Sequence, residues 1–399
     1  MSTTAPPPPR LAPTTAAERS PAPDLARGAA LLAIALANSP LHLTDRDLGP
    51  SGRPVDGSGA DRVADVVVGL LADNRAFPMF TLLLAYGLAV LARRLRERGT
   101  PWPQARWVLL RRTLVLGLVG LAHLLLLFEG DVLLAYGVLG VALVLLVLRA
   151  KESTLRVLAV VGLLPFLLFG GLDGLSVGAE PPLGDLVPST YLGAALLRGV
   201  TAFFTVLGAP VVVLVLLTPA VLGVLLERRQ VLQRPSEHVP ALRRLTVGGF
   251  AIGLLGGLPL VLASVQVIQV GAVADFLLAV LHAGTGLAQA VAAAALAGWV
   301  VAVRERRAGG TWVPTGAWAA LTAVGQRSLT CYLLQSVVMV PLLAPWGLGL
   351  GVGAGTAFVA LVGVGTYLFT VAVALGLQRA GRRGPAEVML RRLVYGRPG

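Results

Sequence analysis

The sequence has few charged residues and a single cysteine. Charged residues make up 13% of the 399 residues, whereas soluble proteins average about 25%. Because Cys331 is the only cysteine, the sequence excludes an intrachain disulfide framework and a cysteine-only zinc site. The chain also lacks a phosphate-binding glycine loop with its lysine, a His-Glu-x-x-His pair and a serine elbow. These absences exclude the common soluble-enzyme and disulfide-stabilised classes.

Long apolar runs make up much of the sequence. Hydrophobic residues make up 56% of the chain, and the mean hydropathy is +0.79. Only helices and closed barrels satisfy backbone polar groups in lipid, and continuous apolar runs exclude a barrel. The sequence therefore predicts an all-α polytopic membrane bundle. Windows near the roughly 20 residues that a bilayer requires predict ten transmembrane helices: 27–43, 76–93, 107–128, 131–148, 154–171, 201–226, 245–265, 275–303, 318–345 and 354–378.

The basic residues cluster in alternate connections between these runs. The formal net charge is +13, and the intervening connections are acidic or nearly free of arginine. This is the positive-inside pattern, and it predicts a multi-pass bacterial cytoplasmic (inner) membrane protein with both termini cytoplasmic. It favours anionic lipids on the cytoplasmic face as partners and argues against nucleic acid. The clusters are 93–112, 149–156, 228–244, 304–307 and 379–397.

Composition divides the chain into three parts. Residues 1–22 are rich in Pro, Thr and Ala and predict a disordered cytoplasmic tail. Residues 23–380 form the transmembrane domain, and 381–399 form a basic cytoplasmic tail. Segments 61–72 and 189–199 are amphipathic and too short to cross a bilayer. They are expected at the outer interface, either as a lid over a cavity or as solvated surface helices.

One hydrophobic hairpin, residues 120–137, carries three ionisable groups. His123 lies within the apolar run, and Glu129 and Asp131 lie at the turn that follows. An ionisable residue in hydrocarbon is costly, so it marks a candidate site. The alternative is a histidine that donates to a neighbouring helix and only holds the bundle together.

Polar side chains also interrupt three other runs. Arg27 and Asn38 are eleven residues apart, about three helical turns, so both project from one face of the first predicted span. The ninth span presents a ribbon of donors and acceptors, for which interhelical hydrogen bonding is the alternative to a site. The remaining candidates are Arg327, Tyr332 and Gln335 in that span and a second apolar-run histidine, His282.

Five ordered motifs resemble the YeiB-type bacterial membrane proteins, catalogued as domain of unknown function 418. They are Asp24-x-x-Arg27-Gly28 with Asn38, Arg75–Phe80 with Tyr86-Gly87, Arg111-Arg112 through His123 to Tyr136, Arg327–Ser336, and Gly384–Glu387 with Arg391–Arg397. The similarity covers nearly the whole membrane portion. Cys331 and Leu390 depart from it, standing where the family usually has Asn and Trp.

The family is similar in layout to the transmembrane acyltransferases, which implies acyl transfer from cytosolic acyl-CoA. The co-substrate would be acetyl-CoA or a longer acyl-CoA, with no covalently bound cofactor and no metal. The acceptor would be a small molecule or a glycan of the envelope. By this resemblance His123 is the base or acyl carrier, and Asp131 orients it with Glu129 nearby. Arg27, Arg111 and Arg112 would meet the CoA phosphates, and the substrate or channel lining would comprise Asn38, Tyr136, His282, Arg327, Tyr332 and Gln335.

Two other classes of function stay open at the level of sequence. A proton-coupled transporter of a small solute or lipid would use His123, Glu129, Asp131 and Arg27 to bind protons or substrate. A non-catalytic lipid-binding scaffold would need only the basic inner face. A homodimer is also left open.

Overall fold

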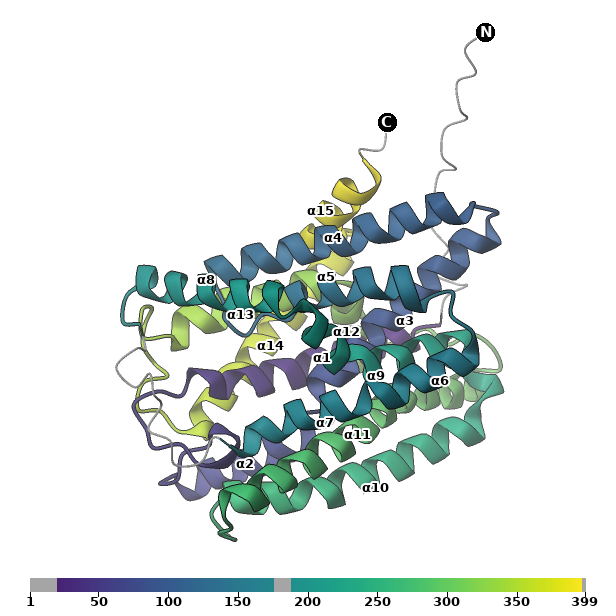
Figure 1. Ribbon diagram of the computed structural model, residues 1–399. Helices are drawn as coiled ribbons and strands as arrows, with labels where there is room; N and C mark the ends of the chain where they lie inside the picture. The colour runs from purple at the N-terminus through teal and green to yellow at the C-terminus, as the bar shows by residue number, and fades with distance from the viewer. Residues whose placement is uncertain (1–19, 176–187, 397–399) are drawn as a thin grey trace.

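The computed structural model describes residues 20–175 and 188–396, which are almost entirely helical. The helices run side by side across the view of Figure 1, with α1 inside the bundle. This confirms the predicted all-α membrane bundle. The helices are α1 Ala22–Asn38, α2 Gly59–Leu71, α3 Ala76–Glu97, α4 Trp102–Leu126, α5 Leu133–Ala142, α6 Glu152–Val161, α7 Leu163–Gly171, α8 Tyr191–Leu207, α9 Ala209–Arg228, α10 Val239–Ser264, α11 Ala272–Ala308, α12 Gly316–Gln326, α13 Ser328–Leu343, α14 Thr356–Arg379 and α15 Pro385–Tyr395.

Within the described residues, seven helical stretches are long and apolar enough to cross a membrane. The sequence predicted ten. Leu133–Val147, Tyr191–Leu207 and Ser328–Leu343 are apolar but shorter, and α1, at 17 residues, ends at Asn38 before the predicted limit of 43. The seven stretches are Gly59–Glu97, Trp102–Leu126, Glu152–Gly174, Ala209–Arg228, Val239–Ser264, Ala272–Ala308 and Thr356–Arg379.

Three of the predicted spans are interrupted helices. The prediction of one span over 201–226 is wrong, because α8 begins at Tyr191, includes most of the segment 189–199 and ends at Leu207. Pro210 follows in the first turn of α9, and proline cannot continue a preceding helix without losing a hydrogen bond. Similar breaks separate α6 from α7 at Gly162 and α12 from α13 at Arg327.

Small residues allow the helices to approach closely. A Cβ on Gly137 of α5 would overlap the backbone of Gly117 on α4, and one on Gly120 would overlap the start of α5. On α10, Gly249 and Gly253 face the side chains and backbone of α11 in the same way. Close backbone approach through small residues is the usual way in which membrane helices associate.

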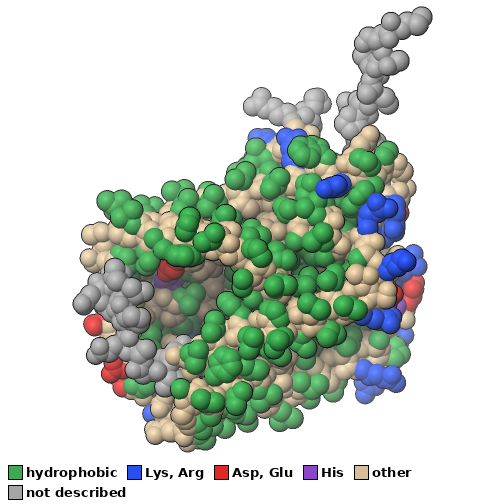
Figure 2. Space-filling model, viewed as in Figure 1, with side chains coloured by type: hydrophobic (Ala, Val, Ile, Leu, Met, Phe, Trp, Pro, Cys, Tyr) green, Lys and Arg blue, Asp and Glu red, His purple; other side chains and the backbone are tan. Residues whose placement is uncertain are grey.

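The two ends of the bundle differ in charge. Figure 2 shows lysine and arginine side chains gathered at the right, where α3, α9 and α11 end; we call this the basic end. The other end, the distal end, carries the connections 39–58, 127–132, 265–271 and 344–355. Most of the predicted N-terminal tail, 1–19, lies outside the described residues. Within the predicted C-terminal tail, 385–395 form α15, which packs on α4 and α13.

Candidate functional site

A histidine and an aspartate meet in the α4–α5 turn at the distal end. His123 lies in the last turn of α4, and Asp131 lies just before α5. The His123 Nδ1 and Asp131 Oδ1 atoms are 2.7 Å apart. The other carboxylate oxygen accepts the backbone N–H of Leu134 at 2.8 Å, which also satisfies an otherwise unpaired donor at the start of α5. The carboxylate therefore fixes the ring and holds a proton on Nδ1.

The opposite ring nitrogen of His123 has no partner. Among the described residues, Nε2 is buried without a hydrogen bond, and the side chains of His123 and Asp131 are 4% and 0% exposed. The ring of Tyr332 lies 5.4 Å away and that of Phe128 lies 6.3 Å away. Buried polar atoms are almost always hydrogen-bonded, so a free lone pair on an oriented imidazole is the arrangement expected of a proton acceptor.

A small cavity lies next to this pair. Its volume is about 70 Å³, and α1, α3 and α5 contribute most of its lining. Asn38 and Tyr136 line it, and so does Val132, the neighbour of Asp131. The Tyr136 hydroxyl donates to the carbonyl of Phe77 at 3.2 Å. Figure 2 shows a hollow on this face of the bundle, with acidic and histidine side chains in its wall.

Tyr332 and Gln335 of the ninth predicted span do reach the bundle interior. The Tyr332 hydroxyl accepts the N–H of Val132 at 3.4 Å, which ties α13 to the turn that holds Asp131. Gln335 donates to the carbonyl of Leu31 at 3.1 Å. Arg327 is instead at the α12–α13 break, where it donates to the carbonyl of Arg382 at 2.8 Å. Only Tyr332 of these three contacts the His123 ring.

The other charged candidates lie away from His123. Arg27 pairs with Asp24 at 3.1 Å and reaches the face of α3 that carries Gly87. Glu129 is exposed in the turn, and Arg111 and Arg112 are exposed on α4. These two arginines precede His123 by twelve and eleven residues, about 17 Å along the helix. The structure therefore does not bring these four residues to the imidazole.

His282 belongs to a separate buried cluster built around Arg75. Arg75 donates to the Gln289 side chain at 3.0 Å and to the carbonyl of Gly253 at 2.9 Å. Its Nη1 contacts the His282 ring and the carbonyl of Asp73. Every guanidinium nitrogen thus has an acceptor, so the cluster joins α3, α10 and α11 as a structural element. The sequence motif that begins at Arg75 was the available signal for it.

The sequence reasoning missed two residues near His123. His42 is buried, and the centre of its ring lies 5.7 Å from that of Phe128. The Phe128 ring also contacts the ring of His123. Arg198 of α8 donates to the carbonyl of Leu125 on α4 at 3.1 Å. The position of Arg198 as a charged residue in the amphipathic segment 189–199 was a signal for it. No sequence pattern indicated that it would contact the end of α4.

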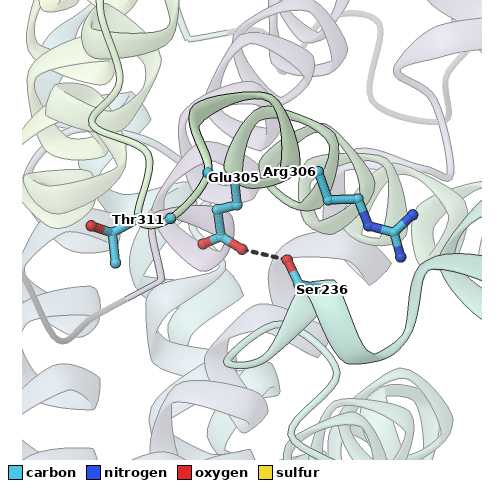
Figure 3. A pocket seen from close by; sticks show the side chains of 6 residues that line it. Ser236, Glu305, Arg306 and Thr311 are labelled. Carbon is cyan, nitrogen blue, oxygen red and sulfur yellow. Dashed lines mark hydrogen bonds between the residues drawn. The ribbon is translucent and has the colours of Figure 1, made fainter.

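A second, wider cavity of about 410 Å³ lies at the basic end. The connection before α10 and the end of α11 form it. Figure 3 shows Ser236 donating to Glu305 there, at 2.6 Å, with Arg306 pointing away. The cavity is remote from His123. In the part of the chain that the structure describes, no three His, Cys, Asp or Glu side chains converge as metal ligands would.

Comparisons with known proteins bear on the family. Residues 226–397 match the family model described as "Protein of unknown function (DUF418)". The "Uncharacterized protein YxaH" of Bacillus subtilis (strain 168) is 31% identical over 156 residues. That match covers 38% of this chain and 38% of that protein, so the chain spans well under half of its relative. No solved structure matches. The C-terminal part of the chain thus matches the DUF418 family model, which is the family that the ordered motifs resemble.

Proposed function

We propose that this protein is a membrane-embedded acyltransferase, which moves an acyl group from acyl-CoA to a hydroxyl or amine of an extracytoplasmic acceptor. One observation carries the proposal. His123 is held by Asp131 at 2.7 Å and keeps an Nε2 that has no partner among the described residues, beside a turn whose Val132 lines a small cavity. A carboxylate that orients an imidazole is a recurring arrangement of general-base catalysis.

The chemistry balances with one proton acceptor. Nε2 takes the proton of the acceptor O–H or N–H as that atom attacks the thioester carbonyl. The carbon–sulfur bond breaks, and the CoA sulfur takes the proton back from Nε2. Asp131 stabilises the imidazolium that exists between these two proton transfers. The products are the acylated acceptor and CoA thiol.

The position of His123 along α4 supports a direction of transfer. His123 is 21 residues from the start of α4 at the basic end, about 31 Å along the helix. The positive-inside rule assigns the basic end to the cytoplasm, with both termini on that side in a bacterial inner membrane. Acyl-CoA would therefore extend through the bundle towards His123, and the acceptor would arrive from the distal side. The cavity of about 70 Å³ holds only a few waters, so α1, α3 and α5 must separate to admit the pantetheine arm.

Release of CoA thiol by purified protein tests the proposal. Wild type, His123→Ala and His238→Ala are compared in detergent with acetyl-CoA and an envelope lipid and glycan extract as acceptor. His238, in the connection before α10, is a histidine control outside the site. Wild type and His238→Ala should release thiol at equal rates, and folded His123→Ala should fall to background. Equal release by His123→Ala would remove the imidazole from the mechanism.

Binding of the donor is measured separately. Acetyl-CoA that binds the folded state should raise the thermal midpoint with the logarithm of its concentration. Arg111→Ala/Arg112→Ala tests whether these arginines take part. Because they are exposed on α4, loss of the shift in this variant would mean that CoA enters along the α4 surface. An unchanged shift would exclude both arginines from donor binding.

The interrupted helices favour a second candidate, the proton-coupled transporter. Broken helices often line transport sites, and breaks occur here at Gly162, Gly208 and Arg327. Solute or lipid flux in proteoliposomes without any acyl-CoA would support transport. Flux that is absent while thiol release is present would support acyl transfer.

A further inference from the structure

Arg198 of α8 is a buried cation that forms no ion pair with any residue that the structure describes. It is 1% exposed, and its Nε donates to the carbonyl of Leu125. Its Nη1 and Nη2 atoms, which carry four N–H donors, have no hydrogen-bond partner among the described residues. Burying a charged guanidinium without partners for its donors is unfavourable, so its unused donors point to an anionic ligand.

Two aromatic rings enclose the guanidinium. Its central carbon lies 5.1 Å from the ring of Tyr191 and 5.8 Å from that of Trp346. Cation–π contacts of this kind offset part of the cost of burial but satisfy no N–H donor. Tyr191 is 45% exposed, so its ring forms the outer wall and its rotation would uncover Nη1 and Nη2.

This cluster is next to the His123 pair. Trp346 packs against the apolar cluster of Phe128, Val340 and Ala344. The ring of Phe128 contacts that of His123. The Tyr191 hydroxyl donates to the carbonyl of Leu126 at 2.7 Å, so α8 is attached to the same turn of α4 that carries His123. A group bound at Arg198 would therefore lie within one or two side chains of the imidazole.

The surface of α8 indicates what kind of molecule carries the anion. Large apolar side chains that are more than half exposed cover this helix. In Figure 1 the helices run across the view, and in Figure 2 the hollow beside α8 faces the viewer, so it opens on the lipid-facing side of the bundle. A soluble anion would enter from the end of the bundle, whereas a lipid would enter from this side. The exposed residues include Leu192, Leu196, Val200, Phe203, Phe204 and Leu207.

We infer that Arg198, Tyr191 and Trp346 bind the phosphate of an anionic lipid from the distal leaflet, with its chains along α8. As a lipid site this stands on the geometry alone. The further idea that this site presents the acceptor to His123 rests on the proposed function. In that case the acceptor is a phosphate-bearing lipid. The binding test below involves no acyl transfer, so the failure of one proposal leaves the other standing.

Native mass spectrometry in a neutral detergent measures the binding. The probes are phosphatidylglycerol, phosphatidylcholine and inorganic phosphate, and the variants are Arg198→Gln and Arg391→Gln. Arg391 is an exposed arginine of α15. Loss of a charge-assisted contact should weaken phosphatidylglycerol binding by about tenfold or more in Arg198→Gln. Arg391→Gln should still bind the phosphatidylglycerol molecule whose binding depends on Arg198. Unchanged affinity in Arg198→Gln, or equal competition by inorganic phosphate, would overturn the lipid site.

A second measurement needs no variant, and so holds even if Arg198→Gln does not fold. Wild type is crosslinked to phosphatidylglycerol with a photoreactive acyl chain, and the labelled peptides are mapped. Crosslinks within Tyr191–Leu207 that an excess of unlabelled phosphatidylglycerol suppresses, and phosphatidylcholine does not, are the expected result. Crosslinks confined to the basic end would refute the site.

Discussion

Two substitutions of Asp131 should separate its structural contribution from its chemical one. The carboxylate has two bonds: Oδ1 with His123 Nδ1 at 2.7 Å and Oδ2 with the N–H of Leu134 at 2.8 Å. Asp131→Ala removes both. The lost helix cap costs about 1 kcal/mol, and the unpartnered imidazole N–H costs about 1–3 kcal/mol. We expect a total destabilisation of about 2–4 kcal/mol, the sum of these two terms.

Asp131→Asn should keep both contacts and lose the chemistry. Its amide oxygen can accept from Leu134, and its NH₂ group then faces Nδ1 of His123. The imidazole must place its proton on Nε2 in order to accept that N–H. We therefore expect a stability change below about 1 kcal/mol, and acyl transfer reduced by about a hundredfold or more.

Unfolding in mixed micelles, followed by tryptophan fluorescence, measures the stabilities, and CoA thiol release measures the reaction. Asp131→Ala and Asp131→Asn change the same position and differ only in the group that replaces the carboxylate, which is a hydrogen atom in one and an amide in the other. If Asp131→Asn were as destabilised as Asp131→Ala, the cap would not survive and the two-contact account would be wrong. If Asp131→Asn kept the wild-type rate, the tautomer of His123 would not matter.

Three other substitutions test the packing. Gly137→Ala should destabilise the bundle by about 1–3 kcal/mol, because the new Cβ overlaps the backbone of Gly117. Glu387→Gln should cost about 1–2 kcal/mol, because its carboxylate accepts two backbone N–H groups at the start of α13. His282→Ala should cost about 2–4 kcal/mol, because it opens a cavity and removes a buried acceptor of Arg75. Unfolding in mixed micelles measures all three.

Two of the packing variants have a control of the same chemical kind. Gly365→Ala in α14 meets no atom within 4 Å and should leave stability unchanged or slightly raised. Glu237→Gln changes an exposed carboxylate whose arginine neighbour is 3.7 Å away, so little effect is expected. If Gly137→Ala behaved like Gly365→Ala, the α4–α5 contact would not be tight. If Glu387→Gln changed the stability no more than Glu237→Gln does, the N-terminus of α13 would not need a carboxylate.

The meeting of His123 and Asp131 was within reach of the sequence, because a short turn joins their helices. Eight residues separate them across a single hairpin, so few arrangements are open to their side chains. The helix breaks were harder, since hydropathy windows average over a single position. At Gly208, the nearby Pro210 is the local signal that a helix cannot run through, and it outweighs the continuous apolar pattern of 201–226.

Long-range contacts were not predictable in the same way. Arg198 and Leu125 are 73 residues apart in the chain, and their contact depends on how α8 leans on α4. The exposure of Arg111 and Arg112 likewise depends on which face of α4 its neighbours cover. The motif that contains both arginines marks the family, but it does not reveal which way their side chains point.

Transfer of label from acetyl-CoA tests the central claim most directly. Membranes with equal amounts of wild type or His123→Gln are supplied with acetyl-CoA labelled in the acetyl group, and the lipid and glycan fractions are counted. The account predicts a labelled, extractable product with wild type and background counts with His123→Gln. Equal labelling by the two proteins, with both shown to be folded, would contradict the account.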